Sequence, residues 1–97
     1  MAYKVELYIG APNDTHKVDN EYLDKVIRWA EEHIPDGFTV VEGHGYYGGL
    51  GEDCIVLTVL SEKSPDFLSD DTIGQLKQTL GQETILVTLQ PIGMRLV

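Results

Sequence analysis

The chain is poor in cysteine and in basic residues. Its one cysteine, Cys54, excludes an internal disulfide bond, and no Cys/His spacing typical of a zinc site occurs, so no metal site is expected. Seven lysines and arginines stand against 16 acidic residues, which gives a net charge of −9. Nucleic acids and anionic membrane surfaces are bound through lysine and arginine, so neither is an expected partner.

Long apolar runs are also missing. No stretch approaches the roughly 20 residues that a membrane-spanning helix requires, and the N-terminal residues lack the apolar core of a signal peptide. We therefore expect a cytoplasmic protein, unless a leader peptide has been removed. A chain of 97 residues is the size of one domain, and we assign residues 1–97 to it.

What the chain does contain is clear strand periodicity. Residues 3–9 alternate between apolar and polar side chains, which predicts a half-buried strand. Further strands are predicted at residues 38–42, 54–60 and 84–90, with Pro91 ending the last. The segment 54–60 is almost continuously apolar, which is typical of a central strand covered on both faces.

Two segments between these strands have helical periodicity. Asp19 or Asn20 is expected to cap the first helix, and Ser69 or Asp70 the second. Gly81 is expected to end the second helix, because glycine tolerates the left-handed conformation found there. Three large side chains are predicted at the margin of the first helix's apolar stripe: Tyr22, Trp29 and His33.

The resulting order β-α-β-β-α-β predicts an α+β domain of the ferredoxin-like type. This fold is a four-stranded antiparallel sheet with two helices on one face. The other face would be open, and it would carry a largely apolar mixture: Tyr8, Val41, Val56, Thr58, Leu86 and Thr88. Exposed patches of this kind mark association. We therefore expect a homo-oligomer, a trimer or a dimer, that packs these faces together.

The most distinctive stretch joins the second and third predicted strands. Five of the ten glycines lie between residues 43 and 51, together with two adjacent tyrosines. This composition predicts a glycine-rich loop. The loop either serves only as a flexible turn, or binds a ligand through free backbone N–H groups and the tyrosine rings. The predicted ligand-binding residues are Gly43, His44, Gly45, Tyr46, Tyr47, Gly48, Gly49 and, from the C-terminal tail, Arg95. No cofactor is expected, because the string G-x-G-x-x-G precedes a strand and not a helix.

The titratable residues of this stretch support catalysis or metal binding less strongly than its glycines and tyrosines support ligand binding. Histidine is able to act as a general base at neutral pH, but a solvated loop residue is the simpler interpretation of His44. Metal binding by His44 with Glu52 and Asp53 would require a turn that brings all three together. Cys54 is interpreted as an inert core thiol. We therefore assign no catalytic residue.

Three separated segments carry a resemblance to a known family: 6–10 (ELYIG), 35–45 (PDGFTVVEGHG) and 81–91 (GQETILVTLQP). They resemble a family of small bacterial proteins of unknown function whose pattern reads ELYFG, PDGLTV-DGQG-W and GQESV---QP. The similarity runs nearly end to end, although here the tryptophan region is replaced by Tyr46-Tyr47-Gly48-Gly49. It implies a ferredoxin-like fold and kinship, and no activity.

A second, more limited resemblance involves residues 37–45. The pattern G-x-T-V-x-E followed by G-H-G is similar to the second-strand region of PII signalling proteins. Those proteins share the strand order, form trimers and bind small ligands at clefts between subunits. This chain lacks their long effector loop and their lysine-rich phosphate loop, so the resemblance implies a related architecture without their nucleotide site.

These observations favour an oligomeric ligand-binding or regulatory domain, PII-like in arrangement and not an enzyme. It would bind a small molecule or a protein partner through residues 43–51. One alternative is a small cofactor-free isomerase or monooxygenase of the dimeric ferredoxin-like kind, with His44 or Tyr46 transferring a proton. Another is a purely structural subunit of an assembly.

Overall fold

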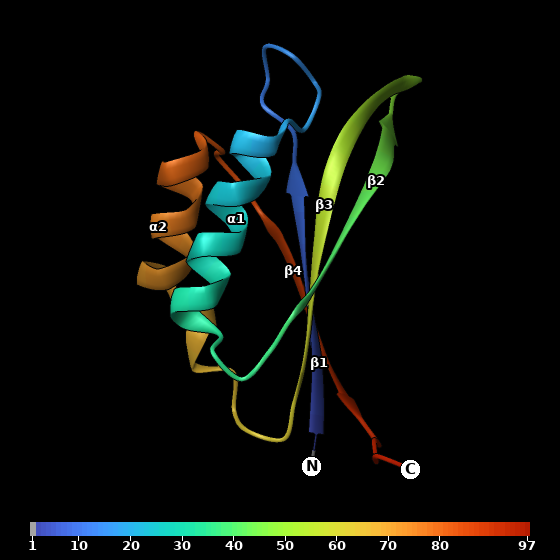
Figure 1. Ribbon diagram of the computed structural model, residues 1–97. Helices are drawn as coiled ribbons and strands as arrows, with labels where there is room; N and C mark the ends of the chain where they lie inside the picture. The colour runs from blue at the N-terminus through green and yellow to red at the C-terminus, as the bar shows by residue number, and fades with distance from the viewer. Residues whose placement is uncertain (1) are drawn as a thin grey trace.

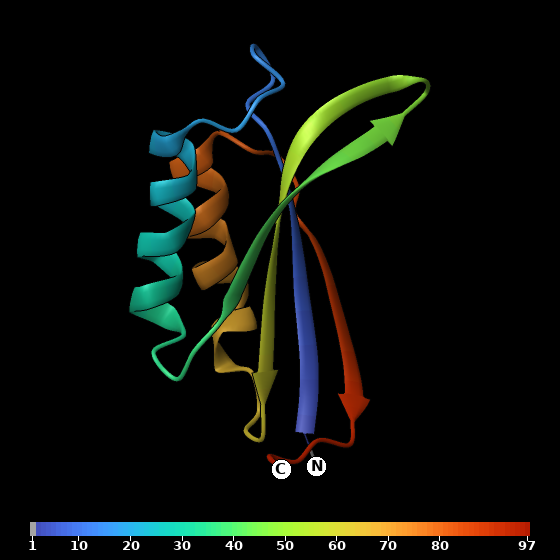
Figure 2. The same cartoon turned by 45° about the vertical axis from the view of Figure 1, so that its right-hand side comes forward.

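The computed structural model describes residues 2–97 (Figure 1). Its elements are β1 (Ala2–Gly10), α1 (Asn20–His33), β2 (Thr39–Tyr47), β3 (Leu50–Ser61), the short 3-10 helix η1 (Asp66–Leu68), α2 (Asp70–Leu80) and β4 (Leu86–Ile92). Within these residues the strands form one antiparallel sheet in the order β2-β3-β1-β4. Both helices lie side by side on one face of it (Figures 1 and 2). The predicted ferredoxin-like fold is confirmed.

The core lies between this sheet and the two helices. Val5 and Leu7 of β1 and Leu57 of β3 are fully buried there, because their alternation places them all on the helix side of the sheet. Tyr22 and Trp29 are buried as well, so their predicted place at the margin of α1 was wrong. Their polar atoms have backbone acceptors: the Tyr22 hydroxyl donates to the Gly10 carbonyl and Trp29 Nε1 donates to the Thr72 carbonyl at 3.0 Å. A satisfied polar tip allows a large ring to enter a core.

The helix ends follow the predicted capping. Asp19 Oδ1 accepts a hydrogen bond from Tyr22 N at 2.8 Å, and Ser69 Oγ accepts one from Thr72 N at 3.2 Å. Gly81 ends α2 with φ of 68°. The turn at Gly81 brings Gln82 back to the end of β1, where its side-chain amide donates to the Ala11 carbonyl at 2.9 Å.

The other sheet face carries the residues predicted for it: Tyr8, Val41, Val56, Thr58, Leu86 and Thr88. Tyr8, Val41 and Leu86 are 38, 53 and 62% exposed. Within one chain, the helices therefore cover β3 on one face only, and the expectation of cover on both faces is not met there. Pro91 also pairs, opposite Tyr3, which β4 tolerates because it is an edge strand.

The strands β2 and β3 continue beyond the sheet as a two-stranded arm, residues 44–53. The β1–β3 pairing ends at Gly10 and Cys54, whereas β2–β3 pairing continues to Tyr47 and Leu50. The arm curves away from the helices in both views (Figures 1 and 2). The predicted loop over 43–51 was therefore wrong for most of its length. Gly48 and Gly49 alone form the turn, with φ of 58° and 84°, as a two-residue hairpin requires.

No helix among residues 2–97 is long and apolar enough to cross a membrane. The longer of the two α-helices, α1, has 14 residues.

Candidate functional site at the base of the arm

The arm's glycines accommodate its two tyrosine rings. Tyr46 pairs with Gly51, where an added Cβ would lie 2.9 Å from the Tyr46 ring. On the opposite face of the arm, the Tyr47 ring lies over Gly45, at 3.2 Å from an added Cβ. Both rings therefore lie close to a glycine, yet they remain 74 and 71% exposed. The Tyr47 side chain lies on the same side of the β2–β3 ladder as the open sheet face, and the Tyr46 side chain lies on the helix side.

Asp53 fastens the arm to the segment that precedes α1. Its backbone N–H donates to the His16 carbonyl at 2.9 Å, and its carboxylate accepts from Val18 N at 3.0 Å. The second carboxylate oxygen lies 3.1 Å from His44 Nδ1. One acidic residue thus connects β3, β2 and the 11–19 segment, which fixes the direction in which the arm leaves the sheet.

The Glu52 side chain lies on the face of the arm opposite to Asp53 and reaches the end of β1. Its Oε2 lies 3.4 Å from His16 Nδ1, and its Oε1 lies 3.4 Å from where a Cβ on Gly10 would be. Burial raises the pKa of the nearby Tyr22 hydroxyl, a hydrogen bond from Gln82 lowers it, and the charge of Glu52 raises it further. The hydroxyl accordingly remains a neutral donor at physiological pH.

A cavity of about 310 Å³ opens where the arm meets the ends of β1 and β4. It is lined by Tyr8, Ile9, Gly10, Tyr47, Glu52, Cys54, Gln82, Thr84 and Leu86. Among these described residues Glu52 alone carries a charge. An adjoining hollow of about 260 Å³ shares Tyr47 and Glu52 and extends toward His16 and Leu50. Cys54 is a partly exposed wall of the cavity, so its interpretation as a core thiol was wrong.

The residues predicted to form one ligand site are distributed over the molecule. Tyr47 lines the cavity, whereas His44 and Tyr46 lie on the other side of the arm. The glycine turn is at the arm's tip, and Arg95 follows β4 near the C-terminus, at the opposite end of the molecule (Figure 1). Within one chain, Arg95 and the arm are therefore not brought together. Whether any of these residues binds a ligand stays a prediction.

The three residues considered for a metal are also separated. His44 and Asp53 form one pair, and Glu52 pairs with His16 on the other face of the arm. Among residues 2–97 no group of three or more His, Cys, Asp or Glu side chains is placed to hold a metal ion. The pairing of Glu52 with His16 was missed, since His16 precedes Glu52 by 36 positions.

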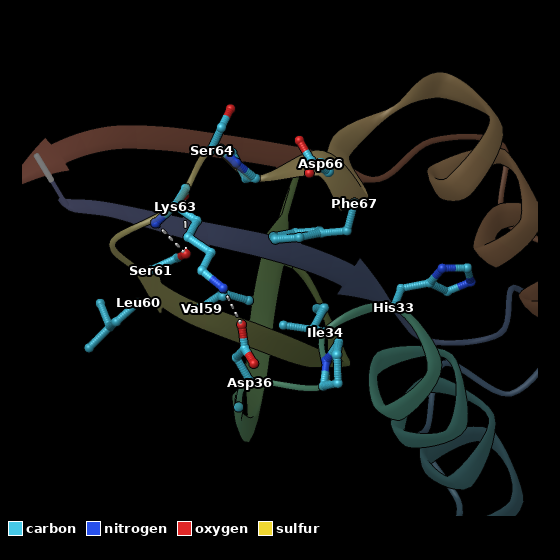
Figure 3. A pocket seen from close by; sticks show the side chains of 13 residues that line it. His33, Ile34, Asp36, Val59, Leu60, Ser61, Lys63, Ser64, Asp66 and Phe67 are labelled. Atoms are coloured by element: carbon cyan, nitrogen blue, oxygen red, sulfur yellow. Dashed lines mark hydrogen bonds and ion pairs between the residues drawn. The ribbon is translucent and has the colours of Figure 1, made fainter.

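A second cavity, of about 160 Å³, lies at the other end of the sheet, between the α1–β2 and β3–η1 connections (Figure 3). Ile34, Val59 and Phe67 line it, and the His33 ring points away from it. Lys63 Nζ and Asp36 Oδ2 face each other at 3.8 Å, with side chains 83 and 84% exposed. Such an ion pair contributes about 1 kcal/mol or less. This cavity is about half the volume of the one at the base of the arm, and Ser61 Oγ in its lining is hydrogen-bonded to the Lys63 backbone.

Comparison with known proteins identifies the fold. No protein-family model matches the chain, and no curated protein matches its sequence. The structure is similar to a phage SAM lyase in its apo state, with a TM-score of 0.60 and 16% identity over 91% of this chain and 78% of that one. It is also similar to a DUF3240 family protein from Shewanella baltica OS155, with a TM-score of 0.56 and 14% identity. That match covers 98% of this chain and 94% of the other. The likeness to a small bacterial DUF protein agrees with the kind of family that the sequence resembles, at the level of the fold.

Proposed function

We propose that this chain is a ligand-binding domain whose site is the cavity at the base of the arm. The ligand is a small molecule that carries a positive charge beside a flat or apolar group. The observation that carries this proposal is the position of Glu52, a single carboxylate set among aromatic, apolar and neutral polar cavity walls.

The carboxylate is suited to recognise a cation. Its side chain is 25% exposed, and His16 lies beside one of its oxygens at 3.4 Å. A partly desolvated carboxylate attracts a cation more strongly than one in bulk water, because the local dielectric constant is lower. The net charge of −9 adds a long-range field of the same sign.

The remaining walls suit a flat group. The rings of Tyr8 and Tyr47 and the side chain of Leu86 supply apolar and aromatic surface, and Gln82 and Thr84 supply hydrogen-bonding groups. The cavity volume of about 310 Å³ is at the lower end of the roughly 300–1,000 Å³ found for small-molecule sites. A ligand of nucleoside size therefore fits better than a macromolecule.

S-adenosylmethionine combines these features, because it has a sulfonium cation and a flat adenine. One structural neighbour is a phage SAM lyase, which makes this compound the natural first probe. S-adenosylhomocysteine is its matched comparator, since it lacks the charged sulfonium and is otherwise the same except for one methyl group.

The test is calorimetric titration of the protein with both compounds. We expect S-adenosylmethionine to bind about tenfold or more tightly than the comparator that lacks the sulfonium. Glu52→Gln should remove this difference, and Asp36→Asn, which removes an equal charge at the other end of the sheet, should preserve it. If neither S-adenosylmethionine nor a panel of cationic nucleosides and aromatic amines binds, the proposal is wrong.

A further inference from the structure

We infer that a second copy of this chain packs against the open sheet face beside the arm and closes the cavity at the arm's base. The first half of this inference concerns assembly, and it is supported by the exposed area, apolar side chains and charges of the chain's surface. The second half rests on the proposed function, because it concerns how the ligand is enclosed.

The chain exposes more surface than a compact monomer of its mass. Its accessible area is 6660 Å², whereas a 10.8 kDa monomer is expected to expose about 5,500 Å². The excess, about 1,100 Å², is larger than the roughly 800 Å² that each partner buries in an interface of standard size. The radius of gyration of 13.8 Å likewise exceeds the roughly 12.5 Å expected for 97 residues.

Much exposed apolar surface lies on one side of the molecule. Leu86 and Val41 on the open sheet face are 62 and 53% exposed, and Tyr47 and Leu50 on the arm are 71 and 76% exposed. The β2–β3 register places Val41, Tyr47 and Leu50 on the same side of the ladder. The arm also curves toward this side, away from the helices (Figure 2). The open face and the arm therefore offer a largely apolar surface for a partner.

The charges of this face favour a copy of the same chain. Lys4 and Glu6 lie on it as alternate residues of β1, next to Tyr8. A second copy running in the opposite direction places Lys4 of one chain against Glu6 of the other, so the face is complementary to itself. This compensation matters because two chains of net charge −9 repel each other elsewhere.

The cavity opens on the same surface. Tyr8, Cys54 and Leu86 belong both to the open sheet face and to the cavity wall. A copy packed on this face therefore covers the cavity mouth and supplies the wall that one chain lacks. Because the assembled form then binds the ligand better, ligand binding and assembly stabilise each other.

Sedimentation velocity at micromolar concentration tests the assembly. We expect the wild-type protein to sediment as a dimer or larger, and Val41→Glu, on the open face, to sediment as a single 10.8 kDa chain with an unchanged circular dichroism spectrum. Leu89→Glu is the matched control, since Leu89 is 51% exposed but lies on the helix side of β4. The control should remain assembled. A wild-type protein that sediments as one chain would overturn the inference.

Titration of the Val41→Glu chain tests the shared site. Val41 does not line the cavity, so this chain keeps the Glu52 wall intact. We expect it to bind S-adenosylmethionine about tenfold or more weakly than the assembled wild-type protein. Equal affinity would show that one chain holds the ligand alone, which overturns the shared site and leaves the proposed function standing. If the wild-type protein binds neither S-adenosylmethionine nor the panel of cationic nucleosides and aromatic amines, the proposed function itself is wrong.

Discussion

The two halves of the β2–β3 ladder have the same backbone pairing and very different surroundings. The inner half continues into the sheet, where Ile55 and Leu57 are fully buried beneath the helices. In the outer half, the arm, Tyr46, Tyr47 and Leu50 are 71–76% exposed. An isolated two-stranded hairpin is marginally stable in water. The inner half therefore makes the fold, and the outer half, fastened by Asp53, exposes its large side chains to solvent.

Removing a core side chain from the inner half should have the largest effect on stability. Leu57→Ala should lower the free energy of unfolding by about 2–5 kcal/mol, because it leaves a cavity in the core. Leu50→Ala in the arm should change it by about 0.5 kcal/mol or less. Urea unfolding of both variants measures the contrast, and comparable losses would show that the arm is part of the cooperative core.

The next largest effect should come from detaching the arm. Asp53→Ala removes the acceptor for Val18 N and the partner of His44, which should cost about 2 kcal/mol. Asp36→Ala, whose partner Lys63 is exposed, should cost about 0.5 kcal/mol. Thermal unfolding compares the two variants. If Asp53→Ala proves as mild as Asp36→Ala, these contacts do not hold the arm.

Substitution at the arm's tip should cost less. Gly48→Ala places a Cβ on a residue with φ of 58°, which costs about 1 kcal/mol. Gly93→Ala is the control, because its added Cβ meets no described atom within 4 Å and its φ is not positive. Urea unfolding of the two variants measures this difference. Equal stability of the two would argue against the two-residue glycine turn.

The smallest effect concerns pH. The pKa of Tyr22 is raised in the folded chain, mainly by burial, so folding favours the neutral hydroxyl. This contribution to stability is fully present below the unfolded pKa of about 10, and it is lost as the pH rises through the folded pKa. Stability should thus fall on going above pH 10, and less steeply in Tyr22→Phe. Parallel pH profiles of the two proteins would contradict this assignment.

The elements of the fold were predictable where local signals agree with the tertiary structure. Asp19 and Ser69 both cap helices as their chemistry predicts, and the alternation in β1 gives the correct buried face. The burial of Tyr22 and Trp29 was not predictable from the helical pattern. Their hydroxyl and N–H are satisfied by acceptors 12 and 43 positions away, which only the folded chain brings close.

The candidate site was less predictable than the fold. The cluster of glycines in residues 43–51 drew attention to this region of the chain. Because glycine is depleted in strands, however, the same cluster led to the prediction of a loop. Gly45 and Gly51 in fact lie beneath tyrosine rings within a paired arm, and only Gly48 and Gly49 form the turn. Glu52 and Gln82 were missed as cavity walls, because their proximity depends on the register of β3 against β1 and on the turn at Gly81.

Hydrogen exchange of the wild-type protein, with and without S-adenosylmethionine, tests the central claim most directly. Ligand binding at the base of the arm should slow amide exchange in residues 43–54 and 82–86 and leave residues 33–37 and 59–67, around the second cavity, unchanged. Slower exchange confined to residues 33–37 and 59–67 would place the ligand at the other end of the sheet and contradict the account.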